Sequence, residues 1–209
     1  EQCGLKDGMT ISFHHHMRNG DYVLNMVMEA IAEMGFKNLT VNASSVFDVH
    51  EPIIDHIKNG VVTGIECNYM GGKVGKAISE GLMDKPVIFR SHGGRASDME
   101  KGTSVIDIAF IAAPTSDDMG NCTGKFGKSA CGSIGYAFAD AMNAKKVVVI
   151  TDNLVEYPLV DFSIPEVYVD CVVAVDQIGN PAGIVSGTTK ITRDPVGMKM
   201  ASYAAKVIE

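Results

Sequence analysis

Apolar residues along the chain follow two spacings, one typical of buried strands and one typical of amphipathic helices. Apolar runs predict strands at Thr10–Phe13, Leu39–Asn42, Val61–Cys67, Val87–Phe89, Val105–Ala112, Lys146–Thr151 and Val172–Val175. Apolar residues at helical spacing predict helices at Tyr22–Met34, Glu51–Lys58, Gly72–Glu80, Ile134–Asn143 and from Pro195 onward. The regular alternation of strands and helices predicts an α/β fold.

The most apolar run indicates how the strands are arranged. Residues Val147–Ile150 follow one another without polar alternation, so both faces of this strand should be buried. Such strands are typical of a mostly parallel open sheet with flanking helices. Because no internal repeat or low-complexity segment divides the chain, we predict a single α/β domain over residues 1–209.

Composition narrows the class of protein. The chain has 209 residues, 46% of them hydrophobic, and a formal net charge of −7. An acidic chain of this kind is not expected to bind nucleic acid, and no apolar run is long enough to cross a membrane. The sequence shows no signal peptide, and its five cysteines form no CxxC pair. These features favour a reduced, cytoplasmic setting over a disulfide framework.

The two ends of the sequence are typical of a domain taken from a longer polypeptide. The chain opens on Glu1 instead of methionine. Near the other end, Asp194 and Pro195 suit a helix start, and the helical pattern continues to Glu209 without a stop signal.

A run of three histidines follows the first predicted strand and precedes a helix that Asp21 can cap. Ligands of open sheets bind there, beyond the carboxyl ends of the strands. Imidazoles, a guanidinium and free backbone N–H groups all suit a carboxylate or a phosphate. The alternative is that the histidines only satisfy local hydrogen bonds. The candidate ligands in this segment are His14, His15, His16, Arg18, Asn19 and Gly20.

The same histidines do not predict a metal site. Adjacent strand residues point to alternate faces, so the rings of His14–His16 should not all converge on one ion. No aspartate or glutamate lies nearby at a ligand spacing. We expect untagged protein to hold no stoichiometric divalent ion. Elemental analysis that finds one equivalent of zinc or nickel, lost when the histidines are replaced, would contradict this expectation.

A glycine pair lies in the second candidate segment, Asn68–Ala77. Gly71 and Gly72 precede a predicted helix and would allow a phosphate or thioester to approach the backbone closely. A tight turn explains the glycines equally well. The segment is not a Walker loop, because the GK[ST] ending is missing.

The third segment, Arg90–Asp98, is predicted to be a loop that repeats the chemistry of the first. Arginine suits a carboxylate because its guanidinium donates two parallel hydrogen bonds. The alternative is that the arginines only pair with neighbouring acids. The candidate ligands are His92, Gly93, Gly94 and Arg95.

The fourth segment, Ala112–Gly124, is predicted to be a loop after a buried strand. Its candidates are Thr115, Gly120 and Asn121; the Gly-Asn pair predicts a sharp turn, and the asparagine amide suits a substrate carbonyl or hydroxyl. Its cysteine, Cys122, has no local histidine and is more typical of a small core residue than of a nucleophile.

The order of these segments resembles the first domain of the CoA-transferase family. The resemblance spans nearly the whole chain and rests on the runs "IDIAFIAAPTSDDMGNCTG", "AKKVVVITDN" and "IPEVYVDCVVAVD". Three further runs closely resemble the citrate lyase alpha chains within that family. They are "SFHHHMRNGD", "SHGGRASDMEKG" and "CGSIGYAFADAMNAKKVVVITDNLVEYP".

The resemblance implies a citrate CoA-transferase, which exchanges acetate for citrate on the thioester of an acyl carrier protein. It also implies an oligomer with the carrier protein and a lyase beta subunit. No cofactor would be tightly bound, because the CoA-like prosthetic group of the carrier is a co-substrate. Arginines and histidines would hold the citrate carboxylates. The pyrophosphate of the prosthetic group would lie against Gly20, Gly71, Gly72 and Gly120.

The sequence departs from the family in one respect. Many CoA-transferases use a glutamate nucleophile in a glycine-flanked motif in the second half of the full chain, and no such motif occurs here. The catalytic residue therefore stays unassigned, and the chain is expected to hold a substrate-binding half.

Two rival functions remain open at this stage. The same fold serves enzymes of sugar phosphates, for which Asp117 or Asp118 would be the carboxylate base. A non-catalytic domain that docks the carrier protein would instead need a basic surface patch. The lysines that are candidates for such a patch are Lys73, Lys76, Lys125 and Lys128.

Overall fold

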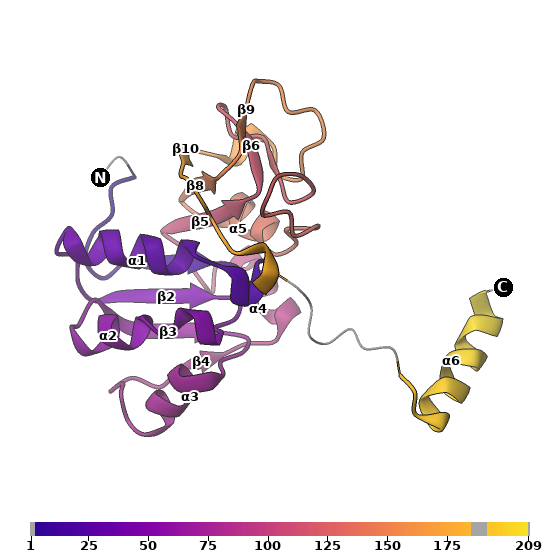
Figure 1. The fold of residues 1–209 in the computed structure, drawn as a ribbon. Coiled ribbons are helices and arrows are strands. Elements are labelled where there is room, and N and C mark those ends of the chain that lie inside the picture. The colour runs from indigo at the N-terminus through magenta and orange to yellow at the C-terminus, as the bar shows by residue number, and fades with distance from the viewer. Residues whose placement is uncertain (1–2, 185–191, 209) are drawn as a thin grey trace.

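A parallel sheet forms the centre of the computed structural model, which describes residues 3–184 and 192–208. Within these residues, seven strands pair in parallel in the order β10-β8-β5-β1-β2-β3-β4 (Figure 1). They are β1 (Thr10–Phe13), β2 (Leu39–Ala43), β3 (Val62–Cys67), β4 (Ile88–Phe89), β5 (Ile108–Ala113), β8 (Lys146–Thr151) and β10 (Cys171–Ala174). The predicted mostly parallel α/β fold is confirmed, and the predicted strands are each found to within about three residues.

The chain reverses its direction of travel across the sheet between β4 and β5. It first builds outward from β1 through β2, β3 and β4, and then returns to place β5 on the other side of β1. The carboxyl ends of β1 and β5 therefore flank the point where the strand order switches, and such a point leaves a crevice for a ligand.

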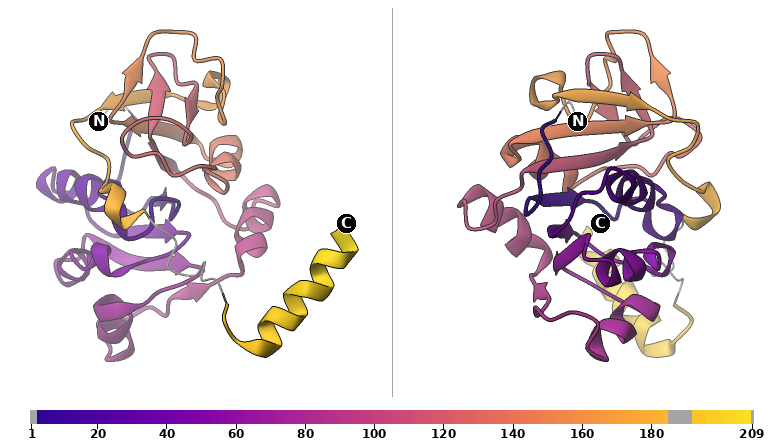
Figure 2. Two further views of the ribbon diagram at one scale, coloured as in Figure 1. Left: turned by 45° about the vertical axis from the view of Figure 1, so that its right-hand side comes forward. Right: turned by 90° about the vertical axis from the view of Figure 1, so that its left-hand side faces the viewer.

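Helices cover both faces of the sheet (Figure 2). One face carries α1 (Val23–Glu33), α2 (Ile53–Lys58) and α3 (Gly72–Ser79), and the other carries α4 (His92–Glu100) and α5 (Ala137–Asn143). Helix α1 begins where predicted, because the Asp21 carboxylate accepts hydrogen bonds from Val23 N (3.1 Å) and Leu24 N (3.4 Å). No residue of the last helix, α6 (Pro195–Ile208), is buried. No helix in the described ranges is long and apolar enough to cross a membrane.

The prediction of a loop at Arg90–Asp98 is wrong, because most of this segment forms α4. Its start is capped by Ser91, whose Oγ accepts a hydrogen bond from Gly94 N at 3.0 Å. The adjacent glycines hide this helix in the sequence, since glycine disfavours helices and favours turns.

The predicted loop Ala112–Gly124 also contains short strands that the sequence pattern does not show. A small second sheet has the order β7-β6-β9, with β6 (Thr115–Asp117), β7 (Cys122–Thr123) and β9 (Leu154–Val155). Its strands are two or three residues long, which is too short for an alternating pattern to be recognised. The remaining described elements are the 3-10 turns η1 (Arg18–Gly20), η2 (Asp48–His50), η3 (Glu166–Tyr168) and η4 (Pro181–Gly183).

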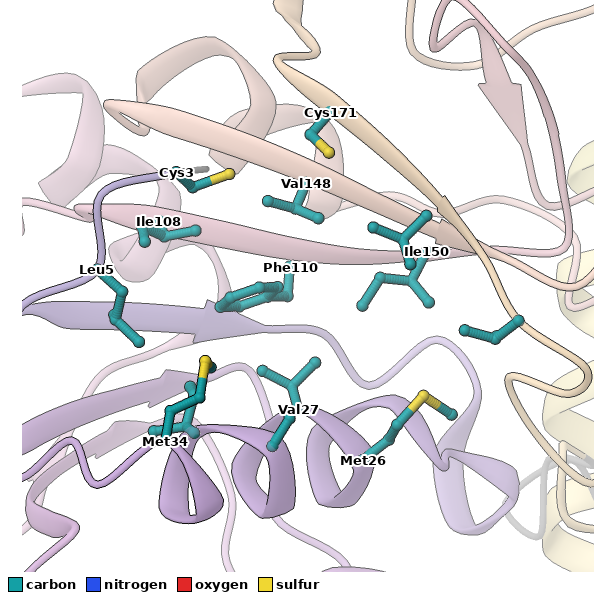
Figure 3. Close-up of a pocket in the computed structure, with 14 residues that line it drawn as sticks. Cys3, Leu5, Met26, Val27, Met34, Ile108, Phe110, Val148, Ile150 and Cys171 are labelled. Carbon is teal, nitrogen blue, oxygen red and sulfur yellow. The ribbon is translucent and has the colours of Figure 1, made fainter. Parts of the chain in front are cut away.

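An apolar groove of about 510 Å³ runs between α1 and strands β5, β8 and β10 (Figure 3). Phe110, Val148 and Ile150 form its floor, and Met26 of α1 and Met34, the residue after α1, form one side. Every described side chain that lines it is a hydrocarbon, a thioether or a thiol. Such a lining offers no charge or strong hydrogen-bond donor that could recognise an anion.

Candidate active site

A polar pocket of about 190 Å³ lies beyond the carboxyl end of β1, at the strand-order switch. One wall is the histidine segment, and the opposite wall is formed by residues 131–136, which precede α5. The side chains that give the pocket its chemistry are His14, His15, His16, Arg18, Ser44 and Tyr136. Four of these were predicted. Ser44 belongs to no recognisable motif, and Tyr136 lies in one of the runs that carry the family resemblance but was not singled out as a ligand.

The three histidines turn toward three different partners. His14 Nε2 lies 3.1 Å from Asp140 Oδ2, and His15 Nδ1 lies 2.6 Å from Ser44 Oγ. His16 Nε2 donates to the carbonyl of Ala112 at 2.8 Å. Within the described part of the chain, no three histidine, cysteine, aspartate or glutamate side chains are grouped so that they could hold a metal ion. The three histidine rings therefore do not converge on one point, as the prediction of no bound metal ion requires. That prediction still has to be tested by elemental analysis.

Two of the histidines are uncharged at neutral pH. Burial, with His92 and Arg18 nearby, lowers the pKa of His15 to about 4. Burial and the neighbouring His14 likewise lower the pKa of His16 to about 4. Neither ring therefore contributes a charge to the pocket, and the guanidinium of Arg18 supplies the fixed positive charge among its described lining residues.

Aromatic rings close one side of the site. The His15 ring centroid lies 5.5 Å from that of His92 and 6.1 Å from that of Tyr136, and His92 and Tyr136 are 5.4 Å apart. His92 is the first residue of α4, so the amino end of that helix faces the same site. Unpaired backbone N–H groups at a helix start favour an anion.

Arg95 does not lie in a loop, contrary to the prediction from the sequence. It is buried in α4, and its two terminal nitrogens donate to the two carboxylate oxygens of Asp140 at 2.6 and 2.7 Å. Its Nε donates to Asn42 Oδ1 at 2.7 Å. Since all three nitrogens are engaged inside the protein, the structure makes Arg95 a part of the framework behind the pocket.

Asp140 is a buried acid behind the pocket that the sequence analysis did not identify. Its carboxylate is fully buried in α5 and also accepts a hydrogen bond from Ser12 Oγ at 2.5 Å. Burial alone would raise the pKa of Asp140, but His14 and the bidentate Arg95 together hold it well below its usual range. The sequence did contain a signal for this residue. Asp140 lies on the same apolar helix face as Ala137 and Ala141, and an acid in such a position must be buried with a partner.

The other arginine of the third segment also pairs within the protein. Arg90 NH1 donates to Glu66 Oε2 at 2.6 Å, and its Nε donates to Asp98 Oδ2 at 2.8 Å. The Asn42 amide joins the two systems, because its Nδ2 donates to the same Glu66 oxygen at 2.9 Å. The alternative of pairing with a neighbouring acid is thus met by Arg90, which contacts Asp98, whereas Arg95 pairs with the distant Asp140.

The fourth segment folds around Asp117 instead of facing the pocket. The turn at Gly120 is confirmed, with φ of 112°, but the Asn121 amide donates to Asp117 Oδ2 (2.9 Å) and Glu166 Oε2 (3.0 Å). Thr115 is buried and its hydroxyl accepts from Asn153 Nδ2 at 2.9 Å. The predicted ligand roles of these side chains are therefore replaced by internal hydrogen bonds.

The remaining predicted glycines serve packing. A β-carbon at Gly20 would lie 2.4 Å from the carbonyl oxygen of Asn180, so this glycine lets η1 pack against η4. Gly71 and Gly72 open α3 as predicted, but the Asp48 carboxylate lies directly against Gly72. A pyrophosphate placed there would meet that negative charge, which argues against the predicted phosphate site. Asn19, His92 and Gly93 are exposed, and Gly94 is half-buried.

Comparison with solved structures defines the class of fold. Glutaconate coenzyme A-transferase from Acidaminococcus fermentans matches with a TM-score of 0.60 over 86% of this chain and 73% of its own, at 14% identity. An acyl-CoA transferase from Escherichia coli O157:H7 matches with a TM-score of 0.62 over 90% of this chain and 50% of its own, at 12% identity. The fold is that of the CoA-transferases.

Sequence comparison identifies the family within that class. The family model for the citrate lyase alpha subunit matches residues 1–209, and the citrate lyase alpha chain of Haemophilus influenzae is 50% identical over all of this chain. A solved alpha subunit of citrate lyase from Streptococcus mutans, in complex with citrate, is 56% identical with a TM-score of 0.91 over 99% of this chain. The chain belongs to the citrate lyase alpha subunit family. It spans 42% of the Haemophilus relative and 41% of the Streptococcus chain.

Proposed function

We propose that this chain forms the citrate-binding half of a citrate CoA-transferase, which exchanges acetate for citrate on the thioester of an acyl carrier protein. The observation that carries the proposal is the pocket of histidines, Arg18, Ser44 and Tyr136 at the strand-order switch of a citrate lyase alpha family member. Guanidinium, imidazole and hydroxyl groups suit a substrate with several carboxylates.

In the proposed reaction, a citrate carboxylate oxygen attacks the carbonyl carbon of the acetyl thioester. The carbon–sulfur bond breaks, the thiolate leaves, and a mixed anhydride of acetate and citrate remains. The thiolate then attacks the citryl carbonyl and acetate leaves, so no net proton or electron is exchanged. The part of this chain is to orient the citrate carboxylates, with Arg18 as the cation that faces them.

Both rival functions lose support in the structure. Asp117 is fully buried and accepts five hydrogen bonds, and Asp118 is exposed away from the pocket lining, so neither carboxylate is placed as a base for a sugar phosphate. The four lysines considered for a docking patch each lie within 4.0 Å of a carboxylate oxygen. Such paired lysines do not form an unbalanced basic surface.

The test is thioester exchange by the full-length chain, with acetylated carrier protein and labelled citrate. We expect label to enter the carrier protein, and Arg18→Met to raise the KM for citrate roughly tenfold or more, since a hydrogen bond to a charged group contributes about 1.5–3 kcal/mol. Lys73→Met is the control, because it also removes one positive charge, from an exposed ion pair with Glu51. It should leave the exchange rate unchanged. Folded protein that binds the carrier but transfers no citrate would support the docking function instead.

A further inference from the structure

Ser44 holds both the backbone and the ring of His15. It is the first residue after β2, and its backbone N–H donates to the carbonyl of Phe13, the last residue of β1, at 3.2 Å. The hydroxyl oxygen of this fully buried serine accepts from His15 N at 2.9 Å and lies 2.6 Å from His15 Nδ1. One atom at the end of a strand therefore fixes the place of the His15 ring on the pocket wall.

The Ser44 hydroxyl also decides which ring nitrogen of His15 carries the proton. A serine hydroxyl has one proton to donate and two lone pairs that accept. Ser44 accepts from the backbone of His15, and among the described contacts His15 Nδ1 is the one acceptor for the hydroxyl proton. With a proton on Nδ1 the buried hydroxyl would have no acceptor, which is rare in proteins. Nδ1 is therefore the acceptor, and the neutral ring carries its proton on Nε2.

The Nε2–H group of His15 is free to bind a ligand. It makes no hydrogen bond within the described part of the chain. It is also not among the fully buried unpaired atoms, which include both ring nitrogens of His14 and Nδ1 of His16. The Nε2 proton of His16 is already donated to the carbonyl of Ala112. Of the three histidines, His15 is thus the one whose ring offers an unused N–H to the pocket.

The charges around His15 favour an anion beside this N–H group. The pKa of His15 is lowered to about 4 by burial first, and then by His92, Arg18, His14 and Arg95. Each of these four side chains is a cation or becomes one on protonation, so they attract an anionic oxygen to the ring. A hydrogen bond from a neutral N–H to a carboxylate is charge-assisted and roughly twice as strong as a neutral one.

We propose that Ser44 orients His15 as an Nε2–H donor to a carboxylate of citrate, beside the guanidinium of Arg18. This inference rests on the proposed function and adds the group that binds one carboxylate and the residue that positions it. His15 contacts the substrate, whereas Ser44 acts through His15 and is a positioning residue. Since the hydrogen bond is already present before the reaction, its loss should raise the KM for citrate more than it lowers kcat.

The experiment measures citrate binding by calorimetry, and KM and kcat in thioester exchange, with the full-length chain. His15→Phe keeps an aromatic ring but removes the donor, so Kd and KM for citrate should rise roughly tenfold or more, the range for a hydrogen bond to a charged group. His15→Gln places an amide N–H near the position of Nε2 and should recover most of the affinity. Ser45→Ala is the matched control, because it removes the neighbouring buried hydroxyl, which donates to the Ser44 carbonyl, and should leave Kd unchanged.

Two further readouts separate positioning from a structural role. Ser44→Ala should raise the Kd for citrate roughly 3- to 10-fold, the range for one neutral hydrogen bond. In the His15→Gln background the same change should have little effect, because an amide donor has no tautomer to be set. Nitrogen NMR of histidine-labelled wild-type protein should show the His15 proton on Nε2, with the signals of this ring identified by their loss in His15→Gln.

Each outcome decides the inference. It is overturned if His15→Phe binds citrate as the wild type does, if Ser44→Ala weakens binding equally in both backgrounds, or if the proton lies on Nδ1. Propane-1,2,3-tricarboxylate lacks the hydroxyl of citrate, and His15→Phe should weaken the binding of both compounds equally. A loss confined to citrate would assign His15 to the hydroxyl and also overturn the inference. Wild-type protein that exchanges no citrate would refute the proposed function itself, whereas normal exchange by His15→Phe refutes only the role of His15.

Discussion

Replacing Arg95 by methionine should lower the free energy of unfolding by about 3–5 kcal/mol, the usual result of removing one partner from a buried ion pair. The Asp140 carboxylate would be left fully buried with only His14 and Ser12 beside it. The measurement is the denaturation midpoint of the variant beside that of Lys73→Met. That control breaks an ion pair whose lysine is 73% exposed, for which about 0–1 kcal/mol is expected.

A double variant separates the lost charge balance from lost packing. Arg95→Met combined with Asp140→Leu removes both charges, and we expect it to recover part of the stability lost in the single variant, because apolar replacement of a whole buried pair is often neutral. If Arg95→Met instead keeps the wild-type midpoint while citrate exchange collapses, Arg95 is a substrate ligand, as the sequence first suggested. The framework role assigned here would then be wrong.

Replacing Asp117 by alanine should cost roughly 3 kcal/mol or more, because it leaves several buried donors without an acceptor and each such donor costs about 1–3 kcal/mol. Asp117 Oδ1 accepts from the backbone N–H groups of Met119, Gly120 and Asn121 at 2.8–3.1 Å. Its Oδ2 accepts from Leu159 N and from the Asn121 side chain, both at 2.9 Å. Asp118→Ala, at the exposed neighbour, is the control and should shift the denaturation midpoint little.

The same residue should make stability depend on acid. Burial would raise the pKa of Asp117, but the hydrogen bonds from Leu159, Asn121 and Gly120 lower it overall. The unfolded chain therefore binds a proton at Asp117 more readily than the folded chain does. The ionised carboxylate stabilises the fold fully above the unfolded pKa of about 4, and this stabilisation is lost as the pH falls through the lowered pKa of the folded protein. Asp117→Asn should flatten the fall in stability below about pH 4. An unchanged acid profile would show that Asp117 is not ionised in the folded protein.

Strands and helices with long apolar patterns could be predicted from the sequence, and elements fixed by a few polar contacts could not. Val147–Ile150 lies in β8 because an uninterrupted apolar run is stable only when both faces are covered. Helix α4 was missed because its first turn holds Gly93 and Gly94, which outweighed the local Ser91 cap, and because the Arg95 contact that stabilises it is a tertiary feature. Propensity alone cannot register a helix that is held by a side chain from α5.

In the candidate site, too, local features could be predicted from the sequence and tertiary contacts could not. The histidine segment was recognisable, because a strand exit before a capped helix is a local feature that also marks the ligand edge of a parallel sheet. Arg95 was assigned to the ligand because its only visible acids were neighbours in sequence, whereas Asp140 lies 45 residues away. Asn121 was misassigned for the same reason, since Glu166 is another 45 residues along the chain. Which polar groups satisfy each other is decided by topology, and a single sequence does not show it.

The central position of β1 has a consequence for the order in which the protein is made. Its pairing with β2 joins residues about 30 apart, but Ile11 pairs with Ile108, and Ser12 donates to Asp140, 128 residues later. A nascent chain that has emerged only through α4 can complete the β1–β4 half of the sheet, yet it holds Arg95 without its counterion. Such long-range closures are slow, and they expose unpaired edges to association meanwhile. During synthesis the histidines therefore emerge long before Asp140, the buried carboxylate beside His14, and the pocket can be completed only after α5 has left the ribosome.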